Sequence, residues 1–177
     1  VDIDGEFGTL INGWAVTGES ISSIQSDKLN DFDISSNGDI FVVGSFSESE
    51  TLGDFELNHQ SENDGFLAKI SEIGDWIDVK VFSNIDDLSV EKISLNSDGK
   101  IAIAGHFSGN TMTCDELSVD NKNGGTGSSD VFIATLDSDL NCLWLNSLGG
   151  ERDDTVNDIL IRDDGTVSNF ASYSDGS

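Results

Sequence analysis

The chain has 177 residues, with 8 lysines and arginines against 34 aspartates and glutamates, which gives a formal net charge of −26. A surface this acidic repels phosphate backbones and anionic lipids, so neither nucleic-acid binding nor membrane binding is expected. Apolar residues make up 36% of the chain and 19 glycines are added to them, so the acidity does not predict disorder. The length suits one folded domain, or part of a larger one.

The first predicted elements are two short strands at the amino terminus. Residues 7–11, followed by a run that begins at Trp14, have the form of a β-hairpin. Ahead of them, three carboxylates stand at alternate positions before a turn, and such hard oxygen ligands suit calcium. This candidate calcium site lacks the other ligands of a twelve-residue calcium loop, and its residues are Asp2, Asp4 and Glu6.

Three later segments align without gaps and predict tight hairpins. They are residues 34–46, 95–107 and 161–173. Each contains Asn or Asp followed by Gly, the dipeptide favoured in type I′ turns, between two β-rich runs. Six residues after each turn glycine comes a small residue, and an aromatic residue follows two positions later. The turn glycines are Gly38, Gly99 and Gly165.

A second hairpin follows the first in two of these units. Residues 66–70 lead into 76–81, and residues 131–136 lead into 143–148. The run that follows each turn glycine is nearly all apolar, as in 40–43, which predicts strands covered on both faces by stacked sheets. Each unit therefore predicts four antiparallel strands. A tryptophan precedes each turn glycine, at Trp14, Trp76 and Trp144.

The repeat predicts an all-β, β-propeller-like array, because no window sustains helical periodicity and four-stranded units of this kind form propeller blades. A β-sandwich does not explain why tryptophan, turn glycine and aromatic residue return in a fixed order. The expected units are 28–83, 90–148, and 156–177 together with 1–17. In related propellers the strand before the turn glycine is innermost and the strand that carries the tryptophan is outermost.

Four stretches resemble the bacterial β-propeller repeat called SBBP, which occurs in secreted and cell-surface proteins. They are residues 130–137, 144–150, 153–154 and 159–165. The resemblance spans two full units and parts of a third, and it implies an extracellular location without indicating a ligand.

The sequence departs from the repeat at two places. Ser83 and Asn84 replace the two glycines of the later unit, and Ser168 and Asn169 stand where the other units are apolar. The second departure predicts a strand that is less buried than its equivalents.

Three blades fall below the four to eight that normally close a propeller. We therefore expect the chain to be part of a longer array, or to associate with copies of itself through unpaired strand edges. In the second case the amino-terminal strands of one copy would complete the last unit of its neighbour.

The chain contains two cysteines, Cys114 and Cys142. A single pair does not make a disulfide framework, so two partly buried free thiols are favoured over one bridge.

No catalytic motif stands out, which favours a protein that is not an enzyme. The sequence shows no nucleophile elbow, phosphate loop, dinucleotide motif or zinc spacing. His106 falls on the repeat position of Ser45 and Ser172, so for it and for His59 a structural role is favoured over a catalytic base. The enzyme alternative, a propeller lyase or hydrolase, requires unlike polar residues on the innermost strands. There the sequence offers Asp33, Ser94 and Arg162.

Paired aspartates precede two of the predicted inner strands and are a second candidate calcium site. The alternative is that they form Asx turns or cap the connecting backbone. No cofactor is required in either case. The residues are Asp86, Asp87, Asp153 and Asp154.

The long polar connectors, 47–63 and 108–129, are the expected recognition surfaces, because function on such scaffolds usually lies in loops. We expect a non-enzymatic extracellular module of a bacterial surface or secreted protein, acting in adhesion or in binding of a carbohydrate or protein. A purely architectural spacer is the alternative.

Overall fold

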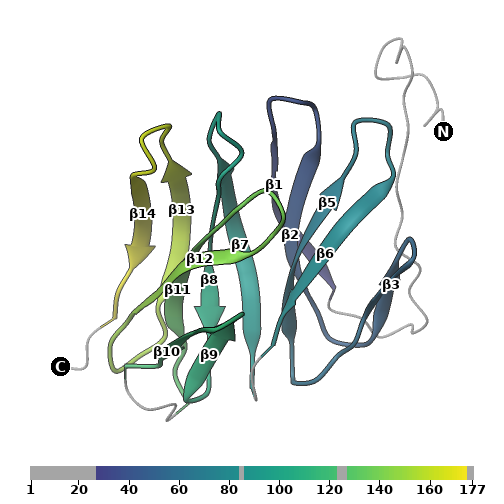
Figure 1. Cartoon of the computed structure of the whole chain (residues 1–177). Helices are drawn as coiled ribbons and strands as arrows, with labels where there is room; N and C mark the ends of the chain where they lie inside the picture. Colours follow the sequence, from purple (N-terminus) through teal and green to yellow (C-terminus); the bar gives the residue numbers. More distant parts are fainter. Residues whose placement is uncertain (1–26, 84–85, 123–126, 175–177) are drawn as a thin grey trace, which may run out of the picture.

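The structure is a computed structural model that describes residues 27–83, 86–122 and 127–174 (Figure 1). Every regular element within these residues is a β-strand, which confirms the all-β prediction. No helix in this part of the chain is long and apolar enough to cross a membrane. The predicted amino-terminal strand pair lies outside the described residues.

The first sheet has four antiparallel strands in the order β1-β2-β5-β6, as predicted for one unit. A two-stranded hairpin, β3–β4, is inserted between its second and third strands. The strands are β1 (Lys28–Ile34), β2 (Ile40–Phe46), β3 (Glu50–Leu52), β4 (Phe55–Leu57), β5 (Asp64–Ile70) and β6 (Trp76–Phe82).

The second sheet repeats this order as β7-β8-β11-β12, with the inserted hairpin β9–β10 at the same place. Its strands are β7 (Leu88–Leu95), β8 (Ile101–Phe107), β9 (Thr111–Cys114), β10 (Leu117–Asp120), β11 (Asp130–Leu136) and β12 (Cys142–Leu148). The prediction of long polar loops at 47–63 and 108–129 is therefore wrong in part, because each of these segments contains a hairpin.

The third element is a single hairpin of β13 (Thr155–Ile161) and β14 (Val167–Ser172). No residue of β14 is fully buried, whereas most of β2 and β8 is. This confirms the prediction from Ser168 and Asn169 that the last strand is less buried than its equivalents.

The tight turns confirm the predicted hairpins but not the predicted turn type. The Gly38 N–H donates to the Ser35 carbonyl at 2.9 Å, and the Ser35 N–H donates to the Asp39 carbonyl at 2.9 Å. Gly38 has φ of 90°, but Asn37 does not share a positive φ, which a type I′ turn requires. The turn is the three-residue form, with glycine alone in the left-handed region. The same bonds recur at Gly99 and Gly165.

Leu140 occupies this left-handed position in the turn between β11 and β12, with φ of 60°. Its N–H donates to the Asp137 carbonyl at 3.1 Å, as the glycines do in the other turns. A left-handed non-glycine residue costs about 1–2 kcal/mol. The Leu140 side chain is buried in the main core, the apolar cluster between the first two sheets. This burial offsets the backbone cost.

A β-bulge explains the small residue that follows each turn glycine. The first strand of each unit carries one extra residue, and the strand beside it places the small residue opposite the bulge. A Cβ added at Gly44 or Gly105 would collide with a carbonyl oxygen of the bulged strand, from Lys28 or Ser89 respectively. The bulged residues are Asn30, Glu91 and Asn157, and the small residues are Gly44, Gly105 and Ala171.

The three sheets stack in chain order, and Figure 1 shows the turns after β1, β7 and β13 at the same end of the stack. We call the side of a sheet that meets the next sheet its forward face, and the opposite side its rear face. The forward face of the first sheet and the rear face of the second share the main core. The forward face of the second sheet packs against β13. Within the described residues the stack does not close into a ring.

Side-chain hydrogen bonds fix how each first strand lies against the next. The Leu95 N–H on β7 donates to the Asp33 carboxylate on β1 at 2.7 Å. At the equivalent positions one sheet later, the Ile161 N–H donates to the Ser94 hydroxyl at 3.3 Å. Asn30 adds a bond from its side-chain amide to the Val90 carbonyl at 2.8 Å. The first strands thus join neighbouring sheets through backbone groups that no sheet ladder uses.

We predict that Gly105→Ala destabilises the fold by about 2–4 kcal/mol, because the added Cβ meets both the Ser89 carbonyl and the Phe132 ring. Gly99→Ala is the control, since a Cβ at Gly99 meets nothing closer than an ordinary contact and only its positive φ is strained, for a cost of about 1–2 kcal/mol. Urea unfolding followed by tryptophan fluorescence measures both values. Equal losses in the two variants would contradict the role assigned to the bulge.

Candidate functional site: a polar cleft between the first two sheets

A polar cleft of about 280 Å³ lies where the first two sheets meet. It opens beside the bulges, at the beginning of β1 and β7 and at the end of β2 and β8. The first sheet and its connectors contribute amide, hydroxyl, ammonium and carboxylate groups, and the second sheet contributes a hydroxyl, a carboxylate and an imidazole. The lining residues are Lys28, Asn30, Ser45, Asn63, Asp87, Ser89, Glu91 and His106.

His106, on β8, lies between two carboxylates. Its Nε2 is 3.5 Å from the Asp87 carboxylate and its Nδ1 is 3.1 Å from that of Glu91. Burial acts to lower the pKa of His106, but the hydrogen bonds and charges of the two carboxylates outweigh burial and raise it to about 9. The imidazole is therefore protonated at neutral pH and donates from both nitrogens.

Asp87 connects the cleft to the backbone that crosses from the first sheet to the second. The hydrogen bond from His106 is the main cause that lowers the pKa of Asp87, against the opposing effect of burial. The Asn63 side-chain amide donates to the Asp87 carboxylate at 2.7 Å, and the Asp87 N–H donates to the Ser108 hydroxyl at 3.0 Å. Both carboxylate oxygens of Asp87 are thus engaged by protein groups.

The protonation state of His106 bears on the chemistry of the cleft. With its pKa raised to about 9, most of His106 is protonated at neutral pH, which disfavours a role as general base at that pH. The side-chain N–H groups of Asn30 and Asn63 and the carboxylate of Asp87 are already engaged by protein groups. The Lys28 ammonium, the Ser45 hydroxyl and the Glu91 carboxylate provide donors and acceptors. Such a mixture fits a hydroxyl-rich or peptide-like ligand.

Sequence reasoning missed most of this cleft. It treated His106 as a repeat position and sought polar groups on the inner strands at Asp33, Ser94 and Arg162. Asp33 and Ser94 instead accept hydrogen bonds from the backbone of the first strand of the next sheet. The Arg162 carbonyl accepts from the Asn96 side chain at 3.2 Å. A usable signal was the polar pair Asn30 and Glu91, which share one repeat position at the bulge.

Two of the four aspartates predicted to bind calcium, Asp153 and Asp154, make the backbone-capping contacts that the alternative expects. The Ser129 N–H donates to Asp153 at 3.0 Å. Asp154 is buried and accepts from the Gly150 and Ser174 N–H groups at 2.9 and 2.7 Å. Asp86 is exposed beside Asp87. Calcium binding at these residues stays a prediction, and Asp2, Asp4 and Glu6 lie outside the described residues.

Asp130 is a buried carboxylate that sequence reasoning did not single out. The Lys122 N–H donates to its Oδ2 at 2.6 Å, but its Oδ1 has no hydrogen-bond partner among the residues that the structure describes. Burial, and then the charge of Asp154, raise the pKa of Asp130. In the first sheet the equivalent Asp64 also accepts from the Ser61 hydroxyl, at 2.6 Å. The second sheet lacks that bond, so one of its buried carboxylate oxygens is left unpaired.

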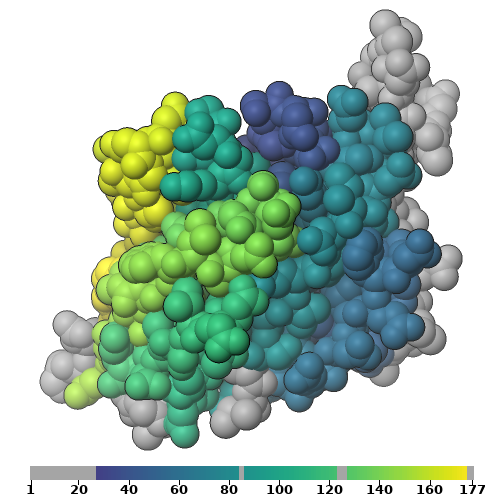
Figure 2. Space-filling view, viewed as in Figure 1, coloured from purple at the N-terminus to yellow at the C-terminus, as the bar shows by residue number. Residues whose placement is uncertain are grey.

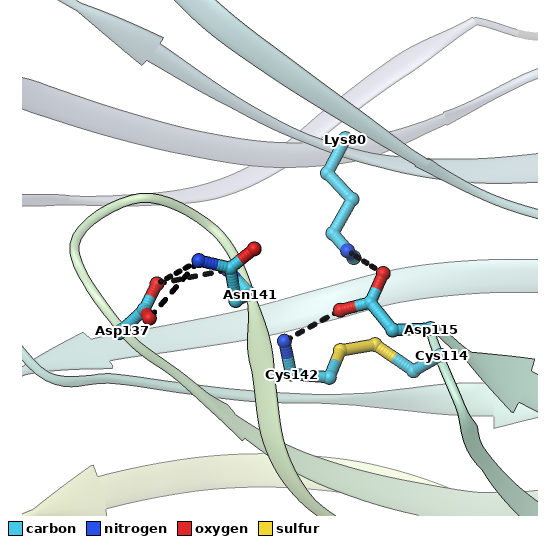
Figure 3. Close-up of a disulfide and its surroundings, with 6 residues drawn as sticks. All are labelled: Lys80, Cys114, Asp115, Asp137, Asn141 and Cys142. Atoms are coloured by element: carbon cyan, nitrogen blue, oxygen red, sulfur yellow. Dashed lines mark hydrogen bonds and ion pairs between the residues drawn. A yellow bond between two sulfur atoms is a disulfide. The ribbon is translucent and has the colours of Figure 1, made fainter.

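Cys114 and Cys142 form a disulfide, so the favoured expectation of two free thiols is wrong. The bond joins β9 to β12 (Figure 3). Asp115, next to it, accepts from the Lys80 ammonium at 2.6 Å and from the Cys142 N–H at 2.7 Å. The hydrogen bond from Lys80 is the main cause that lowers the pKa of Asp115. Because Lys80 lies on β6, this ion pair ties the hairpin of the second sheet to the first sheet.

Within the part of the chain that the structure describes, one group of three side chains is compact enough to hold a metal ion. It consists of Cys114, Asp115 and Cys142. Its two sulfur atoms are joined in the disulfide, so they are not thiolate ligands in this state. In the space-filling view the β9–β10 hairpin lies beside β12 (Figure 2). The disulfide links the hairpin to that strand.

The comparisons with known proteins do not assign the chain to a family. No protein-family model matches it, and no curated protein matches it.

We predict that the charged His106 contributes on the order of 2 kcal/mol to the free energy of unfolding. Since its folded pKa of about 9 is above the unfolded value of 6.5, this contribution is complete below pH 6.5 and is lost as the pH rises through 9. The measurement is urea unfolding between pH 6 and 10. His106→Gln should flatten this part of the profile, and a variant that kept the wild-type slope would contradict the prediction.

We further predict that removing the disulfide lowers the free energy of unfolding by about 2–4 kcal/mol, because the bond closes a loop between cysteines 28 residues apart. The comparison is between the wild type and Cys114→Ser/Cys142→Ser, with and without reductant. Reductant should lower the stability of the wild type alone. Equal unfolding midpoints for both proteins without reductant would contradict the prediction.

Proposed function

We propose that this chain is a non-enzymatic, β-propeller-type repeat module of a bacterial surface or secreted protein, of the kind that the SBBP resemblance implies. Its task is to bind a carbohydrate or protein ligand in adhesion. The repeated strand order of the two four-stranded sheets supports the repeat type. The equivalent hydrogen bonds from the Leu95 N–H to Asp33 and from the Ile161 N–H to Ser94 support a stack that continues by the same rule.

The observation that carries the binding proposal is the polar cleft around His106. It brings together donors and acceptors from two sheets, and its imidazole is mostly protonated at neutral pH, which disfavours a role as general base. A neutral polyhydroxylated ligand exchanges hydrogen bonds with such groups without needing a strong opposite charge. A carbohydrate is therefore the first ligand class to test, and a protein surface is the second.

The disulfide supports an extracellular location. Disulfides persist in oxidising compartments and are rare in the reducing cytosol. The bond between Cys114 and Cys142 is consistent with secretion of the chain, as the resemblance implies.

A purely architectural spacer is the second candidate function, and the inserted hairpins favour it. The expected recognition loops are partly folded against the sheets, with Leu57, Met112 and Cys114 buried. Residues held in this way stabilise the stack and are not free to adapt to a ligand.

A glycan array followed by calorimetric titration of the hits tests the binding proposal. We expect binding that Lys28→Met and Glu91→Gln weaken by about tenfold, as for loss of a charged hydrogen bond. Lys100→Met is the matched control, since Lys100 is exposed in a turn outside the cleft. No binding to glycans or to a library of displayed peptides would favour the architectural role.

A further inference from the structure

The first strand of the stack exposes apolar side chains that its repeats bury. On β1, Leu29, Phe32 and Ile34 are 72%, 63% and 53% exposed. These are unusually large apolar exposures for one short strand, and together they form a patch on the rear side of the first sheet.

The equivalent positions in β7 and β13 show what this patch lacks. Phe32 corresponds to Ile93 and Ile159, which are 6% and 4% exposed. Ile93 is buried against the first sheet and Ile159 against the second. The patch on β1 is exposed because no preceding sheet covers it within the described residues.

An apolar groove of about 320 Å³ continues the patch across the rear face of the first sheet. Val42 and Phe66 line this groove and are 9% and 5% exposed, since other residues of the first sheet and its hairpin pack around them. Their equivalents in the second sheet, Ile103 and Phe132, lie in the core shared with the forward face of the first sheet. The groove therefore lies where a preceding sheet would pack. Its other apolar walls are Leu29, Phe46, Leu52, Leu57, Ile70 and Trp76.

The opposite end of the stack carries the matching forward face. Phe170 on β14 is 64% exposed, yet its equivalents Val43 and Ala104 are fully buried against the next sheet. Leu160 on β13 is exposed at the position where Asp33 and Ser94 meet the next first strand. The two ends thus present the two halves of an interface that the chain already forms twice.

From this pairing we infer that a second copy of the chain docks head to tail, with the forward face of its β13–β14 hairpin on β1 and the rear groove of the first sheet. The contact is heterologous, because different surfaces of the two copies meet, so it generates a closed ring or an open array. This docking uses sheet faces, unlike the edge pairing expected from the sequence. It rests on the stacking of the described sheets, and it can fail or hold independently of ligand binding in the cleft.

Charge sets the conditions under which the contact forms. Each copy carries a formal net charge of −26, so two copies repel one another at low ionic strength. Salt shortens the screening length to about 3 Å at 1 M while leaving apolar contacts in place. Association is therefore stronger at high salt, the opposite of what an interface held by ion pairs would show.

Sedimentation of the full chain over a range of concentrations, in low and in high salt, tests the inference. We expect concentration-dependent association that high salt strengthens. Phe32→Asp and Phe170→Asp should each raise the dissociation constant by about tenfold or more. Ile73→Asp is the matched control, because Ile73 is 69% exposed in the β5–β6 turn, outside both faces, and its variant should associate as the wild type does.

Mixing the two impaired variants gives the decisive measurement. Phe32→Asp keeps an intact forward face and Phe170→Asp keeps an intact rear face, so their mixture should form a 1:1 heterodimer that grows no further. A monomer at all concentrations would overturn the inference. So would association that Phe170→Asp does not weaken, which would indicate rear-to-rear pairing. A monomeric wild type that Phe32→Asp destabilises in urea would also overturn it, because the patch would then be covered by the chain's own remaining residues.

Discussion

The hydrogen bond between a side chain of one first strand and the backbone of the next is the interaction on which the stack depends. Apolar contact alone allows neighbouring sheets to slide, since it is not directional. The Asp33 carboxylate and the Ser94 hydroxyl each accept from one backbone N–H at equivalent positions, and so fix the relative height of two sheet pairs. Once that height is set, the main core, the bulges and the cleft fall at corresponding places in successive sheets.

The repeat predicted from the sequence gave the all-β class, the paired hairpins and the less buried last strand correctly, because alternation and turn glycines are local signals. The turn type was wrong because Asn37 and Asp98 suit several turns, and only the backbone bonds of the flanking strands distinguish them. Leu140 was missed because burial of its side chain offsets a conformation that favours glycine. The disulfide was missed because pairing depends on the hairpin that brings Cys114 to β12.

The candidate site was less predictable than the fold, because it is assembled from positions that no single segment reveals. Lys28 and Asn30 come from one unit, whereas Glu91 and His106 come from the next. The sequence shows that these residues are polar, but their juxtaposition follows from sheet stacking. The paired aspartates illustrate the reverse case, since a conspicuous local pattern at Asp153 and Asp154 makes capping contacts with the backbone.

The bulges also limit how the sequence can change in length. Side chains alternate between the two faces of a strand, so deletion of one residue turns every residue on one side of the deletion to the opposite face. Loss of Glu91 would present Lys92 to the space between sheets or turn the buried Val90 away from it. Insertions and deletions are therefore expected to be tolerated in the connectors, whereas the first strand of each unit must keep its residue count.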